Sequence, residues 1–159
     1  MIVEGLIEAD DCPNILSVTI GDNYSMSGVR PLVAHGVFGI VKVDGKFHFM
    51  MEDDCHFWTA AVISESDLKN AKEAVSTLIG NISVKNNKRT KRPDWGKAKI
   101  KPNHQSTIRK GDVVASFDRS SSVPLIRIKF EHQKSGVAFH PTWYTSLIKT
   151  LNLTERRPK

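Results

Sequence analysis

The clearest pattern of apolar and polar positions lies between residues 37 and 63. The run 37–43 is apolar and rich in β-branched side chains, and 46–51 alternates between polar and apolar residues. Asp44-Gly45 lies between these runs, and both residue types tolerate the positive φ of a two-residue hairpin turn. A third apolar run follows at 57–63. We therefore predict three strands, the first two joined by a tight hairpin.

Two more apolar stretches precede this region, at 2–9 and 15–20. The residues from Asp10 to Asn14 separate them and are typical of a turn. The second stretch is β-branched and predicts a strand, while the polar segment 21–31 is predicted to be a loop.

Residues 64–81 have the period of a helix. Ser64 or Ser66 is predicted to cap its N-terminus, with Asp67 in the first turn and Gly80-Asn81 at its end. We expect this helix to cover one face of the preceding sheet. Its apolar face consists of Leu68, Ala71, Val75, Leu78 and Ile79.

The region after residue 110 returns to strand patterns, at 111–118, 123–130 and 136–139. Pro141 suits the first turn of a last helix, where a backbone N–H has no helical partner in any case. The residues at helical spacing after it are Tyr144, Leu147, Ile148 and Leu151.

Together these elements predict an α+β fold of two small modules, each an antiparallel sheet with one helix. We expect an acidic α+β module at 1–84, a basic connector at 85–107, and a basic β-rich module with a C-terminal helix at 108–159. A chain of 159 residues is long enough for one good core or two small ones.

Charge divides the chain more sharply than composition does. Residues 1–84 carry 5 Lys/Arg and 12 Asp/Glu, and residues 85–110 carry 10 Lys/Arg and a single Asp. Residues 111–159 add 8 Lys/Arg and 4 Asp/Glu. A polyanion would therefore meet the basic side of the molecule.

Residues 85–110 contain few apolar side chains, so we expect a long loop or mobile connector. Clustered Lys and Arg bind phosphates by releasing counterions, and Trp95 is expected to stack on a base or wedge between bases. The alternatives are a solvated loop or contact with an acidic protein. The candidate nucleic-acid contacts are Lys85, Lys88, Arg89, Lys91, Arg92, Trp95, Lys97, Lys99, Lys101, Arg109 and Lys110.

We therefore predict a non-enzymatic nucleic-acid-binding protein, without cofactor or metal, whose phosphate contacts are largely independent of sequence. The expected partner is double-stranded DNA. A host protein bound through the acidic module, at Glu52, Asp53 and Asp54, is an alternative partner.

We expect the protein in the cytoplasm, at the nucleoid if it binds DNA. Met1-Ile2-Val3-Glu4 does not open a secretory signal, and the two cysteines are too few for a disulfide framework. No apolar run approaches 18 residues, so no contact with a membrane is expected.

The stretch Ile108-Arg109-Lys110-Gly111-Asp112-Val113-Val114 resembles the opening strand of KOW, Tudor and other SH3-like small barrels, in which a Gly-Asp turn precedes an apolar strand. The resemblance covers about 20 residues and implies an SH3-like barrel in the C-terminal module that binds nucleic acid or its machinery. The whole chain also resembles small basic DNA-binding proteins made early by large phages.

Two resemblances imply an enzyme instead, a nuclease or a phosphodiesterase. Residues 3–11 are similar to the LAGLIDADG motif of homing endonucleases, with Asp10 as the metal-binding acid. His140-Pro141-Thr142-Trp143 and His56-Phe57-Trp58-Thr59 resemble the paired His motifs of 2H phosphoesterases, in which two imidazoles act as acid and base. A third alternative is a metal site at residues 53–56, joined by 10–12.

Overall fold

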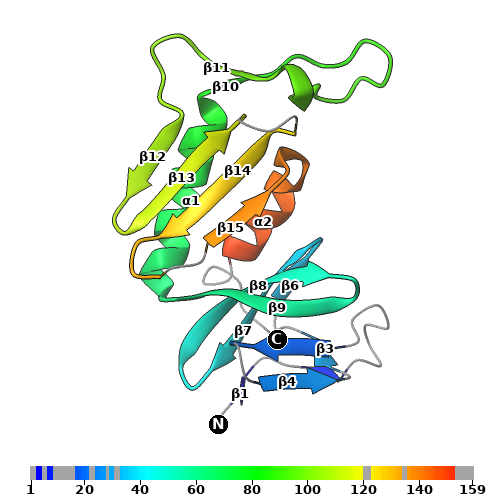
Figure 1. Ribbon diagram of the computed structural model, residues 1–159, viewed down its shortest axis with the longest axis vertical. Coiled ribbons are helices and arrows are strands. Elements are labelled where there is room, and N and C mark those ends of the chain that lie inside the picture. The colour runs from blue at the N-terminus through cyan, green and yellow to red at the C-terminus, as the bar shows by residue number, and fades with distance from the viewer. Residues whose placement is uncertain are drawn as a thin grey trace.

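The computed structural model describes residues 3–4, 7–8, 17–21, 24–27, 29–30, 33–119, 123–133 and 136–152 (Figure 1). These residues form an α+β fold built on antiparallel sheets, as the sequence predicts. Two sheets account for most of it, and Figure 1 shows the first below and the second above. The predicted turn from Asp10 to Asn14 lies outside the described residues.

The first sheet has the strand order β1-β7-β8-β9-β3-β4, with β6 added to β7. All its pairs are antiparallel except β3 with β9, which run parallel. Its strands are β1 (Val3–Glu4), β3 (Ser17–Ile20), β4 (Tyr24–Ser27), β6 (Val33–His35), β7 (Phe38–Val43), β8 (Lys46–Asp53) and β9 (His56–Ile63).

The predicted hairpin at residues 44–45 is confirmed. β7 ends at Val43 and β8 begins at Lys46, and both turn residues have positive φ, 50° at Asp44 and 81° at Gly45. A second hairpin of the same kind joins β8 to β9 through Asp54 and Cys55, with φ values of 53° and 64°. No glycine marks this second turn, so the sequence pattern did not reveal it.

The segment 21–31, predicted to be a loop, contains strands. β4 pairs with β3, and β5 (Val29–Arg30) pairs with β2 (Ile7–Glu8). Polar side chains are compatible with a strand at a sheet edge, where one side of the backbone faces water. The polar composition of this segment therefore did not exclude a strand.

The second sheet is an antiparallel meander in the order β12-β13-β14-β15. Its described strands stay open and do not close into a barrel. They are β12 (Thr107–Lys110), β13 (Val113–Asp118), β14 (Leu125–Phe130) and β15 (Gly136–Phe139).

Helix α1 (Glu65–Gly80) begins at the predicted cap, because Ser64 and Asp67 form a reciprocal capping box. The expectation that it covers the preceding sheet is wrong. α1 packs on β12 and β13 of the second sheet. An apolar stripe predicts that a helix is buried, but it does not say against which partner. The first sheet also has a buried apolar cluster of its own, which includes Val18, Val41 and Phe57.

The C-terminal helix also joins the two sheets. Pro141 opens the short 3-10 helix η3 (Pro141–Trp143), and α2 (Tyr144–Leu151) follows it, as predicted. α2 contacts α1 and also β6 and β7. One continuous core therefore runs from Phe38 of the first sheet to Phe130 of the second.

Polar contacts reinforce this junction at the turn after β14. The side-chain amide of Gln133 accepts from the backbone N–H of Val62 at 2.8 Å and donates back to the carbonyl of the same residue. The neighbouring His132 lies 2.9 Å from the carboxylate of Asp67 at the start of α1. The second sheet is thus fixed to both β9 and α1.

Candidate nucleic-acid interface

A hairpin between α1 and β12 projects from the body of the protein, at the top of Figure 1. At its base β10 (Ile82–Ser83) pairs with β11 (Lys99–Ile100), in the register Ile82 to Ile100 and Ser83 to Lys99. The backbone N–H of Lys101 donates to the carbonyl of Asn81 and closes the base further. We call residues 82–101 the basic arm.

The basic arm has a regular internal structure. The N–H of Asp94 donates to the carbonyl of Lys85, and the N–H of Asn87 donates to the carbonyl of Arg92. At the tip, the side-chain oxygen of Asn87 accepts from the N–H groups of Arg89 and Thr90. The segment expected to be a long loop or mobile connector therefore has a turn defined by backbone hydrogen bonds, which composition alone did not show.

Apolar residues hold the arm to the body. Ala98 is 3% exposed and belongs to the main core, and Trp95 and Ile100 pack against that core. The short 3-10 helix η2 (Trp95–Lys97) lies at this contact. Trp95 was expected to stack on a base, but its half-buried indole also anchors the arm.

Arg119, at the end of β13, fixes the arm from the other side. Its guanidinium donates to the carbonyl oxygens of Ala98 and Gly96, each at 2.8 Å, and more weakly to that of Trp95 at 3.4 Å. Sequence analysis missed this residue. It lies outside the basic run, and a single Arg at a strand end gives no signal of its own.

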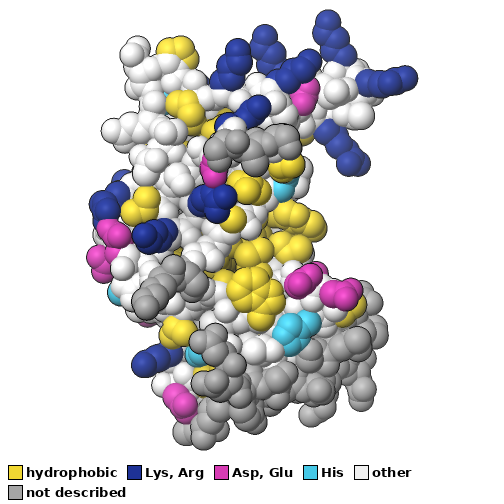
Figure 2. Space-filling view, in the orientation of Figure 1, with side chains coloured by type: hydrophobic (Ala, Val, Ile, Leu, Met, Phe, Trp, Pro, Cys, Tyr) yellow, Lys and Arg dark blue, Asp and Glu magenta, His cyan; other side chains and the backbone are white. Residues whose placement is uncertain are grey.

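Eight of the ten predicted cationic contacts lie together on the arm, and all eight are exposed. None forms an ion pair with a residue that the structure describes. Figure 2 shows Lys and Arg side chains gathered at this end of the molecule. They are Lys85, Lys88, Arg89, Lys91, Arg92, Lys97, Lys99 and Lys101.

The other two predicted contacts, Arg109 and Lys110, lie apart from this group. Both are on β12, which runs away from the arm in Figure 1. Arg109 is paired with Glu131, with 2.5 Å between guanidinium and carboxylate. Neighbours in sequence are therefore separated in space, because a strand carries them down the second sheet.

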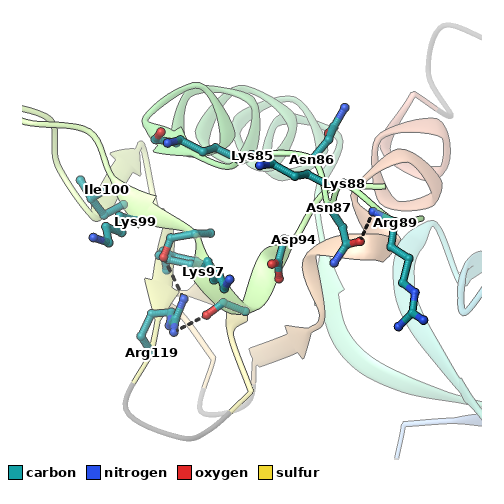
Figure 3. A pocket seen from close by; sticks show the side chains of 14 residues that line it. Lys85, Asn86, Asn87, Lys88, Arg89, Asp94, Lys97, Lys99, Ile100 and Arg119 are labelled. Carbon is teal, nitrogen blue, oxygen red and sulfur yellow. Dashed lines mark hydrogen bonds between the residues drawn. The ribbon is translucent and has the colours of Figure 1, made fainter. Parts of the chain in front are cut away.

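A groove of about 1070 Å³ follows the inner side of the arm. Figure 3 shows Lys85 and Lys88 on one side of it, Lys97 and Arg119 on the other, and Asp94 between them. Its lining also includes the apolar side chains of Ala98, Ile100 and Phe117 and two amides, Asn86 and Asn87. Cationic edges over a partly apolar surface suit a ligand with phosphates and flat rings.

The residues of the enzyme alternatives are placed elsewhere. Asp10 lies outside the described residues, and Val3–Glu4 and Ile7–Glu8 are strands, whereas the LAGLIDADG motif requires a helix. Among the described residues there is no group of three or more His, Cys, Asp and Glu that could hold a metal.

The two His motifs differ in their contacts. His140 Nδ1 lies 3.0 Å from the hydroxyl of Thr142, within its own motif. His56 Nε2 instead lies 2.6 Å from the hydroxyl of Thr19, while Thr59 contacts His48 Nδ1 at 3.1 Å. The motif at His140 therefore has an internal His–Thr contact, whereas His56 and Thr59 contact residues outside their motif.

The acidic residues proposed for a host-protein contact lie at the β8–β9 turn. Asp53 and Asp54 are exposed there, and the Glu52 carboxylate accepts from the N–H of Cys55 at 2.9 Å. Figure 1 places this turn in the lower sheet, away from the basic arm.

Comparison with known proteins finds no family model, no curated protein and no solved structure that matches this chain. In the described part of the chain, no helix is long and apolar enough to cross a membrane.

Proposed function

We propose that this protein binds nucleic acid, with DNA the first candidate, through the phosphate-facing cations of the basic arm. The observation that carries the proposal is the set of eight exposed Lys and Arg side chains without an ion-pair partner among the described residues. Elsewhere on the second sheet, Arg109 and Arg127 are each paired with a carboxylate.

The absence of ion pairs among the described residues of the arm affects the free energy of binding a polyanion. Like charges held close together repel one another, and a salt bridge with a nearby acidic residue usually reduces this repulsion. An arm that keeps its cations unpaired gains more from a polyanion, because each phosphate neutralised releases a condensed counterion. The acidic turn at Asp53 and Asp54, in the lower sheet, favours binding from the arm side only.

The test is a salt series. A labelled 20-nucleotide duplex and the matching single strand are titrated with protein at increasing salt, and affinity is followed by fluorescence anisotropy. A protein with six or more phosphate contacts loses at least about a thousandfold in affinity between roughly 50 and 200 mM salt. No binding at low salt, or binding that salt does not weaken, contradicts the proposal.

A matched pair of variants tests the location. In one, the four cations at the arm tip, Lys88, Arg89, Lys91 and Arg92, are changed to Gln. In the other, four exposed lysines of the body are changed to Gln: Lys46, Lys69, Lys129 and Lys149. The arm variant is expected to lower the slope of log affinity against log salt by about 3. Equal losses in both variants would show that net charge, and not the arm, governs binding.

A further inference from the structure

Asp94 is the one carboxylate among the residues that line the groove, beside six Lys and Arg side chains. Its side chain is half-buried and does not cap η2, which begins at the next residue. It forms no ion pair or hydrogen bond with any side chain in the described part of the chain. A carboxylate that stays unpaired beside six cations is available to a ligand.

The chemistry of that ligand group follows from the charge. A carboxylate repels phosphate, so the part of a nucleic acid that faces Asp94 has to be a hydrogen-bond donor. In a duplex the Watson–Crick edges of the bases are already paired. Asp94 is half-buried in the groove that Lys85 and Lys88 also line, and an unpaired base can present its free edge there.

Guanine offers the best match among the unpaired bases. Its N1–H and its N2 amino group lie side by side and point the same way, as the two oxygens of a carboxylate require for a bidentate contact. Adenine and cytosine present one amino donor beside an acceptor, and thymine presents one imino donor between two acceptors.

Arg119 provides the second half of the site. Hydrogen bonds to the carbonyls of Gly96 and Ala98 fix the plane of its guanidinium, although the residue remains exposed. A rigid, flat cation is a surface on which a base stacks, and stacking accepts any base. In Figure 3, Arg119 and Asp94 lie along the same groove.

We infer that the groove takes an unpaired stretch of nucleic acid and that Asp94 reads a guanine in it by its Watson–Crick edge. The inference rests on the proposed function and departs from the duplex that the sequence led us to expect. Phosphates lie along the lysines, one base stacks on Arg119, and the guanine donates N1–H and N2–H to the Asp94 carboxylate.

The experiment compares short single strands in anisotropy titrations at one fixed, low salt concentration. The probes are nine-nucleotide thymine strands with a central guanine, inosine or thymine, each as DNA and as the uracil-containing RNA counterpart. A hairpin in which the guanine is paired is the seventh probe. The guanine strand is expected to bind about tenfold more tightly than the thymine strand, with inosine between them because it lacks the N2 amino group.

Asp94→Asn keeps the shape of the side chain and removes the charge. It is expected to abolish the guanine preference, while affinity for the thymine strand stays the same or rises because a repulsive charge is gone. Asp112→Asn removes the same charge from an exposed turn outside the groove, and it is expected to keep the preference. Comparing the DNA and RNA strands shows which backbone the groove favours.

The outcomes separate the two proposals. No binding to any probe overturns the proposed function and this inference with it. Binding without guanine preference, a preference that survives Asp94→Asn, or equal affinity for the paired guanine overturns this inference alone. Circular dichroism spectra of both variants confirm that each is folded.

Discussion

His48 shows how a single buried group links the fold to pH. Its side chain is 9% exposed, on β8, and its Nδ1 lies 3.1 Å from the hydroxyl of Thr59. That hydroxyl donates its one hydrogen to the carbonyl of Thr19, so His48 supplies the hydrogen of their contact and carries it on Nδ1. Burial lowers the pKa of His48, and the positive charge of Lys46 lowers it further.

The sign of the pH effect follows from this. The neutral form is favoured in the folded protein, while the unfolded chain takes up a proton near pH 6.5. Stability from His48 is therefore complete above pH 6.5 and is lost as the pH falls from there towards the lower folded-state pKa. We expect the free energy of unfolding to decrease over this range.

His48→Asn tests this, since the Asn amide can replace the Nδ1–H donor without titrating. Urea unfolding at pH 7.5 and at successive lower pH values should show a smaller pH-dependent loss in this variant than in the wild type. His104→Asn, at an exposed position, serves as the control. If the two variants lose stability in parallel with the wild type, His48 is not the group responsible.

At the scale of single residues, the sequence predicted which side chains form a basic group better than it predicted where each of them lies. The basic run was visible because its members are contiguous, and eight of its cations do lie on one arm. The positions of Arg119 and Asp94 in the groove were not visible, because Arg119 follows a distant strand and Asp94 lies among cations only in the folded chain. Arg109 was grouped with the arm by sequence and separated from it by β12.

Among the elements, the tight turns impose the strongest local demands. Gly111 joins β12 to β13 with a φ of 57°, and a Cβ built on it would lie 2.6 Å from the side-chain nitrogen of Asn70 on α1. The glycine therefore serves two purposes. It permits the left-handed conformation, and it lets the turn approach the helix that covers the second sheet.

Gly111→Ala is expected to cost about 1–2 kcal/mol of stability, mainly for the left-handed backbone. The Asn70 side chain can move aside, so the same change in an Asn70→Ala background should recover only a small part of this. Gly80→Ala is the matched control, because nothing lies within 4 Å of the added Cβ. Thermal or urea unfolding measures the change in stability of Gly111→Ala in each background and of Gly80→Ala. Equal losses of stability in Gly111→Ala and Gly80→Ala would contradict a special demand at Gly111.

The periodicity of apolar residues predicted the strands and helices well, but it predicted poorly which elements pack against one another. The strands at 38–43, 46–53 and 56–63 and the helix at 65–80 follow from local patterns. The packing of that helix on strands that begin 27 residues after its end does not, because an apolar face fits any complementary sheet. The arm escaped detection because its turn is held by backbone and Asn87 contacts, not by an apolar repeat.

Over the whole molecule, charge and connectivity act together. The basic arm and the acidic β8–β9 turn belong to different sheets, and the core that runs through Phe38, Leu68 and Phe130 holds these sheets as one body. An approaching polyanion therefore meets a fixed arrangement of attraction and repulsion, which favours one orientation of binding.

The contact between Gln133 and Val62 has a consequence for association between molecules. β3 pairs only with the first part of β9, up to Trp58, and no described strand pairs with β9 on that side beyond it. Exposed backbone groups at such an edge are a template for a strand of another chain. The amide of Gln133 satisfies both backbone groups of Val62 with a side chain, which cannot extend into a further strand.

We therefore expect Gln133→Ala to cause self-association more than a loss of stability. Sedimentation or light scattering would show this as a mean mass that rises with protein concentration. Gln105→Ala, at an exposed site on the loop before β12, should remain unchanged. A Gln133→Ala protein that stays monomeric at high concentration would mean that the edge is protected by something other than this amide. One side chain outside the basic arm therefore occupies the backbone groups of Val62 at this edge of the first sheet.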